Sequence, residues 1–121
     1  MNYTTHYRTI YIDMMDSESK NEVNSIVKFV TAMFHPDDVW VKPYDDPERY
    51  SIIFYFKDID DKYITNPHHR DPKELKSNMF NREIRTYIHN FLGIKTSGSQ
   101  PPDFYSPSEK HPITIYVKSI T

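Results

Sequence analysis

The chain has 121 residues, and its 15 Lys and Arg residues against 17 Asp and Glu residues give a net charge of -2. This length fits a single domain, residues 1–121, with enough side chains for a hydrophobic core. The chain lacks cysteine, which excludes thiol catalysis, disulfides and thiolate metal sites, and its charge balance excludes a bulk basic field that would attract nucleic acid or anionic lipid.

The first predicted element is a strand over residues 6–12, because β-branched and aromatic side chains alternate there. Asp16-Ser17-Glu18-Ser19 is typical of a helix N-terminus, and a helix is predicted to follow it. That helix is expected to end at His35-Pro36, since proline stops it. Its apolar face recurs at three- and four-residue spacing and contains Val23, Ile26, Val27, Val30, Met33 and Phe34.

Two strands are predicted next, over residues 39–42 and 50–56, with a proline- and aspartate-rich turn between them. The second is the most apolar strand and is expected to be central in the sheet. Asp71-Pro72 then begins a second helix, and Gly93 is its predicted C-terminal cap. The inward face of this helix is predicted to contain Leu75, Met79, Phe80, Ile84, Tyr87, Ile88 and Phe91.

Long loops are predicted over residues 57–71 and 94–110, and the last strand over residues 111–117. The terminal strands read almost alike, so they are expected to be neighbours in one sheet. The order β-α-β-β-α-β with right-handed crossovers predicts a ferredoxin-like α+β sandwich. This fold has a four-stranded antiparallel sheet of order 4-1-3-2, with both helices on one face.

The paired terminal strands invite comparison with two-histidine phosphoesterases, which carry a histidine and a Thr or Ser two positions later on each of two strands. Here the spacing is three, from His6 to Thr9 and from His111 to Thr114. A spacing of three directs the two side chains to opposite faces of a strand. In the predicted sheet the two histidines also lie roughly 20 Å apart, at about 3.3 Å per residue. We therefore expect no catalytic residues and no enzymatic activity.

Histidines also suggest a metal site, with His6 near the loop that holds His68 and His69. These three are weak candidates, because adjacent loop histidines seldom point at one ion, and no metal is expected. The chain contains two glycines, so it cannot build a P-loop or a dinucleotide-binding fingerprint. No cofactor is predicted.

The predicted sheet face opposite the helices is the strongest candidate site. It is expected to present an aromatic surface edged by lysine. The 94–110 loop adds two aromatic residues, which either flank this surface or fold over part of the sheet. Such a surface can bind proteins, because Tyr and Trp are enriched at interface cores, or can stack single-stranded bases. The predicted binding residues are Tyr11, Trp40, Lys42, Tyr55, Tyr116 and Lys118 on the sheet, and Phe104 and Tyr105 in the loop.

A short segment, Thr9-Ile10-Tyr11-Ile12-Asp13-Met14, resembles the first ribonucleoprotein motif of RNA-recognition domains. The resemblance covers about six residues. The second motif of that family would fall on residues 49–56, which lack its glycine and the stacking aromatic at its third position. Membership of the family is therefore not predicted.

These observations favour a non-catalytic protein that binds a protein partner or a second copy of itself. The alternative is a single-stranded RNA- or DNA-binding protein, and a divalent-metal hydrolase comes third. The bias toward Tyr, Ile, Asn, Lys and Asp is typical of A/T-rich genomes and suggests a phage or viral accessory, inhibitor or virion protein. Without an apolar run of ~20 residues or a signal-like start, we expect a cytoplasmic protein (host cytoplasm or virion if viral) with no membrane contact.

Overall fold

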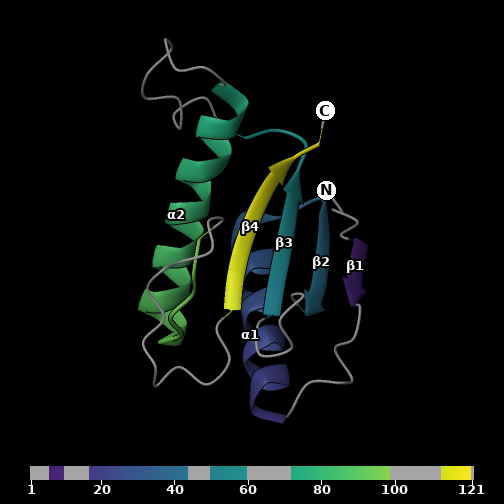
Figure 1. The fold of residues 1–121 in the computed structure, drawn as a ribbon, viewed down its shortest axis with the longest axis vertical. Helices are drawn as coiled ribbons and strands as arrows, with labels where there is room; N and C mark the ends of the chain where they lie inside the picture. Colours follow the sequence, from purple (N-terminus) through teal and green to yellow (C-terminus); the bar gives the residue numbers. More distant parts are fainter. Residues whose placement is uncertain (1–5, 10–16, 44–49, 60–71, 99–112, 121) are drawn as a thin grey trace.

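The computed structural model describes residues 6–9, 17–43, 50–59, 72–98 and 113–120. The predicted order β-α-β-β-α-β is confirmed (Figure 1). None of the helices in these ranges is long and apolar enough to cross a membrane. The elements are β1 (His6–Thr9), α1 (Ser17–Phe34), β2 (Asp38–Pro43), β3 (Tyr50–Phe56), α2 (Pro72–Leu92) and β4 (Ile113–Ser119).

The described strands form one mixed sheet in the order β1-β2-β3-β4. β1 pairs with β2 in parallel, β2 pairs with β3 in antiparallel, and β3 pairs with β4 in parallel (Figure 1). The predicted ferredoxin-like sheet, antiparallel and of order 4-1-3-2, is therefore wrong. The two look-alike terminal strands lie at opposite edges of the sheet, whereas the prediction that β3 is central is confirmed.

The outer edge of β4 explains why β1 does not pair there. The carbonyl of Ile113 accepts a hydrogen bond from the Ser97 amide at 2.8 Å, and the Ile115 amide donates to the Ser97 carbonyl at 2.9 Å. The third hydrogen bond at this edge is donated by the side-chain amide of Asn81 to the Ile115 carbonyl, at 2.7 Å. Because these backbone groups already have partners, the Ile113–Ile115 part of this edge offers no ladder to another strand.

The crossovers explain why the handedness rule selected the wrong order. The strands of the β1–β2 pair run in the opposite direction to those of the β3–β4 pair. In both pairs, however, the chain moves across the sheet the same way, from β1 to β2 and from β3 to β4. Both helices contribute to one core and pack on each other through ring contacts such as Phe34–Phe80, so they lie on the same face. Two such crossovers must have opposite hands. One of them therefore departs from the usual right-handed preference.

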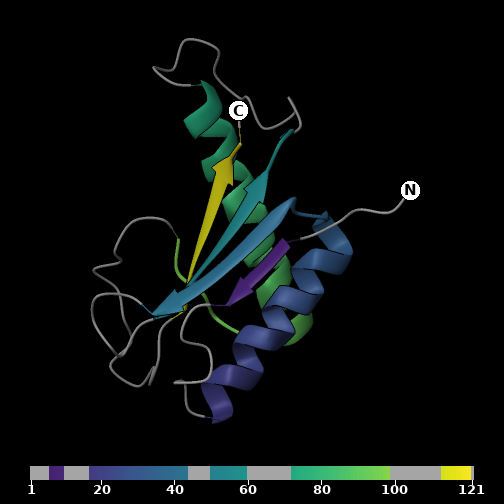
Figure 2. The same cartoon turned by 90° about the vertical axis from the view of Figure 1, so that its right-hand side faces the viewer.

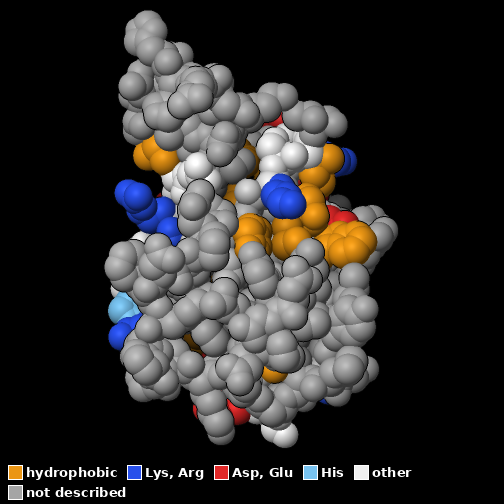
Figure 3. Space-filling model, viewed as in Figure 1, with side chains coloured by type: hydrophobic (Ala, Val, Ile, Leu, Met, Phe, Trp, Pro, Cys, Tyr) orange, Lys and Arg blue, Asp and Glu red, His pale blue; other side chains and the backbone are white. Residues whose placement is uncertain are grey.

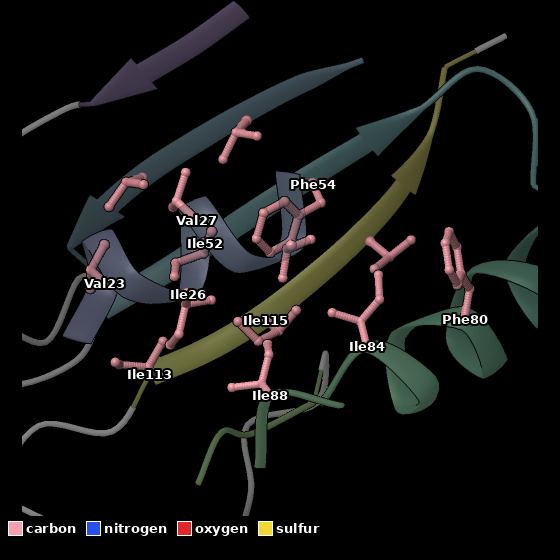
Figure 4. Close-up of a cluster of buried hydrophobic side chains, with 14 of the residues drawn as sticks. Val23, Ile26, Val27, Ile52, Phe54, Phe80, Ile84, Ile88, Ile113 and Ile115 are labelled. Atoms are coloured by element: carbon pink, nitrogen blue, oxygen red, sulfur yellow. The ribbon is translucent and has the colours of Figure 1, made fainter. Parts of the chain in front are cut away.

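The core lies between the helices and one face of the sheet (Figures 1 and 2). α1 lies against that face. α2 runs alongside β4 and covers the side of the core that α1 leaves open (Figure 1). Figure 4 shows side chains from α1, β3, β4 and α2 converging, among them Ile26, Phe54, Ile84 and Ile115. The fully buried helix residues confirm the predicted inward positions at Val23, Ile26, Val30, Ile84 and Ile88. The strands contribute the fully buried side chains of Val39, Val41, Ile52, Phe54 and Ile115.

The ends of both helices differ from the prediction in one respect. Met33 and Phe91 were expected to face inward, but they are 50% and 64% exposed. Each lies in the last turn of its helix. Phe91 packs its ring on Phe29 and Tyr87, so it belongs to the seam between the helices and not to the core.

Both helices end in a residue with a left-handed backbone. His35 has φ 53° and donates its amide to the Thr31 carbonyl, and Gly93 has φ 69° and donates to the His89 carbonyl. These are the hydrogen bonds of αL C-terminal caps. The predicted ends at His35-Pro36 and at Gly93 are confirmed, and the first cap directs the chain straight into β2.

Candidate binding surface

The strand registers bring four predicted binding residues onto one surface. Ile53 of β3 lies directly opposite Trp40 of β2 on one side and Tyr116 of β4 on the other. In the next row on the same face, Tyr55 lies between Asp38 and Lys118. Residues paired in this way hold their side chains about 5 Å apart, so each row spans three strands. We call Trp40, Ile53, Tyr55, Tyr116 and Lys118 the sheet-face patch.

The patch lies opposite the helices and is partly open. Trp40, Tyr55 and Tyr116 are half-buried, Lys118 is exposed, and Ile53 between the rings is only 6% exposed. Figure 3, which views this face, shows hydrophobic side chains gathered over the strands beside Lys or Arg and Asp or Glu atoms. The patch therefore presents an apolar centre with charge of both signs around it.

Asp38 fixes the ring of Trp40. Its Oδ2 accepts a hydrogen bond from the indole Nε1 at 3.1 Å, and its Oδ1 accepts one from the Val39 amide at 2.9 Å. The polar edge of the indole is thus satisfied within the chain. A ring held in this way loses little conformational freedom when it contacts a partner.

Asp37, which directly precedes β2, makes two further hydrogen bonds to β3 and the residue that follows it. Asp37 donates its backbone amide to the Tyr55 carbonyl at 2.7 Å, and its carboxylate accepts the Lys57 amide at 2.7 Å. These contacts tie the start of β2 to the end of β3. They place the Asp37 and Asp38 carboxylates at the patch end where Lys118 lies, so neither sign of charge dominates there.

The other end of the same face is covered. Ser51 and Thr114 pair in register on the face opposite the helices, yet they are 0% and 2% exposed. Among the described residues, the hydroxyl of Ser51 has no hydrogen-bond partner. Among the described side chains of this face, the accessible part lies around Trp40, Tyr55 and Tyr116.

Other predicted site residues lie outside what the structure describes. Tyr11, Phe104, Tyr105, His68 and His69 fall in ranges that are not described. For Lys42 in β2 and His6 in β1 the backbone alone is placed, and His6 lies in register with Asp38.

Asp38 belongs to the candidate surface but was not among the predicted binding residues. It stands two positions before Trp40, and strand alternation puts such a pair on the same face. An Asp-x-Trp pattern within a predicted strand was the available signal, but the predicted strand began one residue later, at Val39.

Within the described ranges, no group of three or more His, Asp or Glu side chains is placed to hold a metal ion. No family model, no curated protein and no solved structure matches the chain.

Proposed function

We propose that this chain is a non-catalytic binding protein that contacts another protein through the sheet-face patch. The observation that carries this proposal is the row Trp40–Ile53–Tyr116, which presents two half-exposed rings across three strands on the face opposite the helices. Aromatic side chains are enriched at the centres of protein interfaces and contribute a large share of binding energy there.

The surroundings of the row support a protein partner. The Trp40 ring is held in place by Asp38, which makes it a preorganised anchor. Asp38 and Lys118 lie in one row on either side of Tyr55, so charges of both signs border the apolar centre. An apolar centre with a polar rim is the usual organisation of a protein interface.

Single-stranded nucleic acid is the second candidate. The rings of Trp40, Tyr55 and Tyr116 lie on adjacent strands, and base stacking on such rings contributes ~1–3 kcal/mol per base. Two carboxylates, Asp37 and Asp38, lie at the same end of the face and repel phosphate. The chain as a whole is also acidic, so the electrostatic term that dominates nucleic-acid binding is weak.

The proposal takes the partner to be either a different protein or a second copy of this chain. In keeping with the sequence prediction, we propose that the protein acts in the cytoplasm. We further propose an accessory, inhibitory or virion role in a phage or virus, which the amino-acid composition favours. A divalent-metal hydrolase remains the third and least supported possibility.

A paired-variant experiment tests the proposal. The wild-type chain, a Tyr116→Ala/Lys118→Glu variant and a matched Lys28→Glu control are used as baits in lysate, with and without nuclease. Their masses in solution are measured over a range of concentrations. Lys28 is exposed on α1, away from the patch, so its charge reversal controls for net charge.

The expected result is a nuclease-resistant complex, with itself or with a defined protein, that the wild type and the Lys28 control form and the Tyr116/Lys118 variant does not. A complex that nuclease abolishes would instead support nucleic-acid binding. A complex that all three baits form equally would rule out this face as the contact surface.

A further inference from the structure

A second surface, on α2, carries basic side chains. Arg82, Arg85 and His89 follow each other at three- and four-residue spacing and so share one side of the helix. Arg82 and His89 are exposed, Arg85 is partly buried, and exposed Lys95 follows the helix. Figure 3 shows Lys or Arg and His atoms along the edge of the molecule that α2 occupies in Figure 1. This surface is distinct from the sheet-face patch.

Arg85 is held in place by a hydrogen-bond relay from the sheet. The side-chain amide of Asn81 donates to the Ile115 carbonyl at 2.7 Å, and its Oδ1 accepts the Nε of Arg85 at 2.6 Å. Asn81 is 3% exposed, so its hydrogen bond to the Ile115 carbonyl is shielded from water, while the one to Arg85 is partly buried. Asn81 is a positioning residue that fixes the guanidinium relative to β4.

The segment after α2 packs against the same guanidinium. A Cβ added at Gly98 would lie 3.1 Å from both Cζ and Nη2 of Arg85. The backbone therefore approaches the guanidinium more closely than a residue with a side chain would comfortably allow. The hydrogen bond from Nε to Asn81 and the close approach of Gly98 together restrict the orientation of the Arg85 guanidinium.

The charge of Arg85 has no counter-ion among the described residues. Its only hydrogen bond there is the one from Nε to Asn81, and no carboxylate pairs with it. Burial, and next the like charge of Arg82, lower the pKa of Arg85. A partly desolvated cation beside a second cation is stabilised by an anion. The planar guanidinium suits the oxygen atoms of a phosphate or carboxylate in particular.

We propose that Arg85 and Arg82 bind the phosphate group of a phosphate monoester at the corner between α2 and Gly98. A monoester carries close to two negative charges at neutral pH, since its second pKa is about 6. The two positive charges of neighbouring guanidinium groups are balanced by a phosphate monoester more fully than by a carboxylate, which carries a single negative charge. The site does not depend on the function proposed for the sheet-face patch.

NMR titration of the full chain tests this site. Inorganic phosphate, O-phosphoserine, acetate and chloride are added at equal ionic strength and neutral pH. The readouts are the side-chain Nε–H signal of Arg85 and the backbone amide signal of Gly98. We expect saturable shifts of both signals with phosphate and O-phosphoserine, weaker ones with acetate and none that saturate with chloride.

Single substitutions test whether Arg85 and Arg82 are responsible for phosphate binding. Arg85→Gln is expected to bind phosphate at least about tenfold more weakly, because it loses charge-assisted hydrogen bonds. Lys28→Gln on α1 removes one positive charge elsewhere and is expected to bind like the wild type. If Arg85→Gln does not fold, exposed Arg82→Gln serves instead and is expected to weaken binding several-fold.

Three results would overturn the proposal. These are equal shifts with chloride and phosphate, acetate binding as tightly as phosphate, and unchanged phosphate affinity in the arginine variants. Binding through the sheet-face patch is measured separately with the Tyr116→Ala/Lys118→Glu variant, so the two proposals can fail independently.

Discussion

The two faces of β3 differ in burial and in chemistry although their residues alternate along one strand. Ile52 and Phe54 face the helices and are fully buried, while Ile53 and Tyr55 face the other way within the sheet-face patch. The helix side is uniformly apolar, whereas the patch side combines half-buried rings with charge. The helix side of β3 is therefore wholly buried and apolar, whereas the other side changes from buried Ser51 and Ile53 to the half-buried ring of Tyr55.

The largest expected effect separates these two faces directly. Phe54→Ala removes a fully buried ring and is expected to lower the free energy of unfolding by about 3–5 kcal/mol. Tyr55→Ala, at the next position on the other face, is expected to cost about 1 kcal/mol, since that ring is half-exposed. Urea unfolding of the two variants measures both values. Equal losses would show that the two faces do not differ in this way.

The next effect concerns the protected edge of β4. Asn81→Ala removes the donor to the Ile115 carbonyl and the acceptor of Arg85, and leaves a buried carbonyl without a partner. We expect a loss of about 1–3 kcal/mol. The matched control is exposed Asn90→Ala on the same helix, which is expected to change stability by less than about 0.5 kcal/mol. A neutral Asn81→Ala would contradict the role of this side chain at the edge.

The helix caps should give smaller effects of opposite sign. Gly93 has a positive φ, so Gly93→Ala is expected to destabilise by about 1 kcal/mol. His35 is a non-glycine residue in the same conformation, so His35→Gly is expected to stabilise by a few tenths of a kcal/mol. Thermal unfolding of the two variants checks both signs. The same sign in both would contradict the assigned backbone conformations.

The smallest effect on stability belongs to the patch rim. Lys118→Glu changes an exposed side chain and is expected to alter the free energy of unfolding by less than about 0.5 kcal/mol. It is nevertheless expected to weaken partner binding and to change its salt dependence, because rim charges steer association. Affinity measured at two salt concentrations, with Lys28→Glu as the control, tests this separation of stability from binding.

Local features of the fold were predictable from the sequence. Residues 50–56 form β3 as predicted, and the helices end at the predicted His35-Pro36 and Gly93 positions. These features depend on side-chain alternation, helical spacing and backbone preference, which act over a few residues. The order of the strands depends instead on which backbone edges remain unpaired after the helices pack.

The similarity of the terminal strands was therefore misleading. It reflects a shared preference for extended structure and carries no information about pairing partners. Asn81 and Ser97 occupy the outer edge of β4 at Ile113 and Ile115, and the sequence does not mark either of these polar residues as a partner of that strand. Likewise, the burial of Ser51 and Thr114 depends on tertiary packing, which strand alternation does not predict.

The candidate surface was partly predictable. Trp40, Tyr55, Tyr116 and Lys118 were expected on the face opposite the helices, and the registers bring them together there. Their grouping within three strands follows from β2, β3 and β4 being consecutive in the sheet. The predicted order would have separated β4 from β3 by β1.

Photo-crosslinking from within the sheet-face patch tests the proposed contact surface most directly. A benzoylphenylalanine is introduced at position 116, and at position 86 on the exposed side of α2 as the control. The account predicts a covalent adduct with a polypeptide, either a second copy or a defined partner, from position 116 and none from position 86. Equal adducts from both positions, no adduct from position 116, or an adduct with nucleic acid would contradict it.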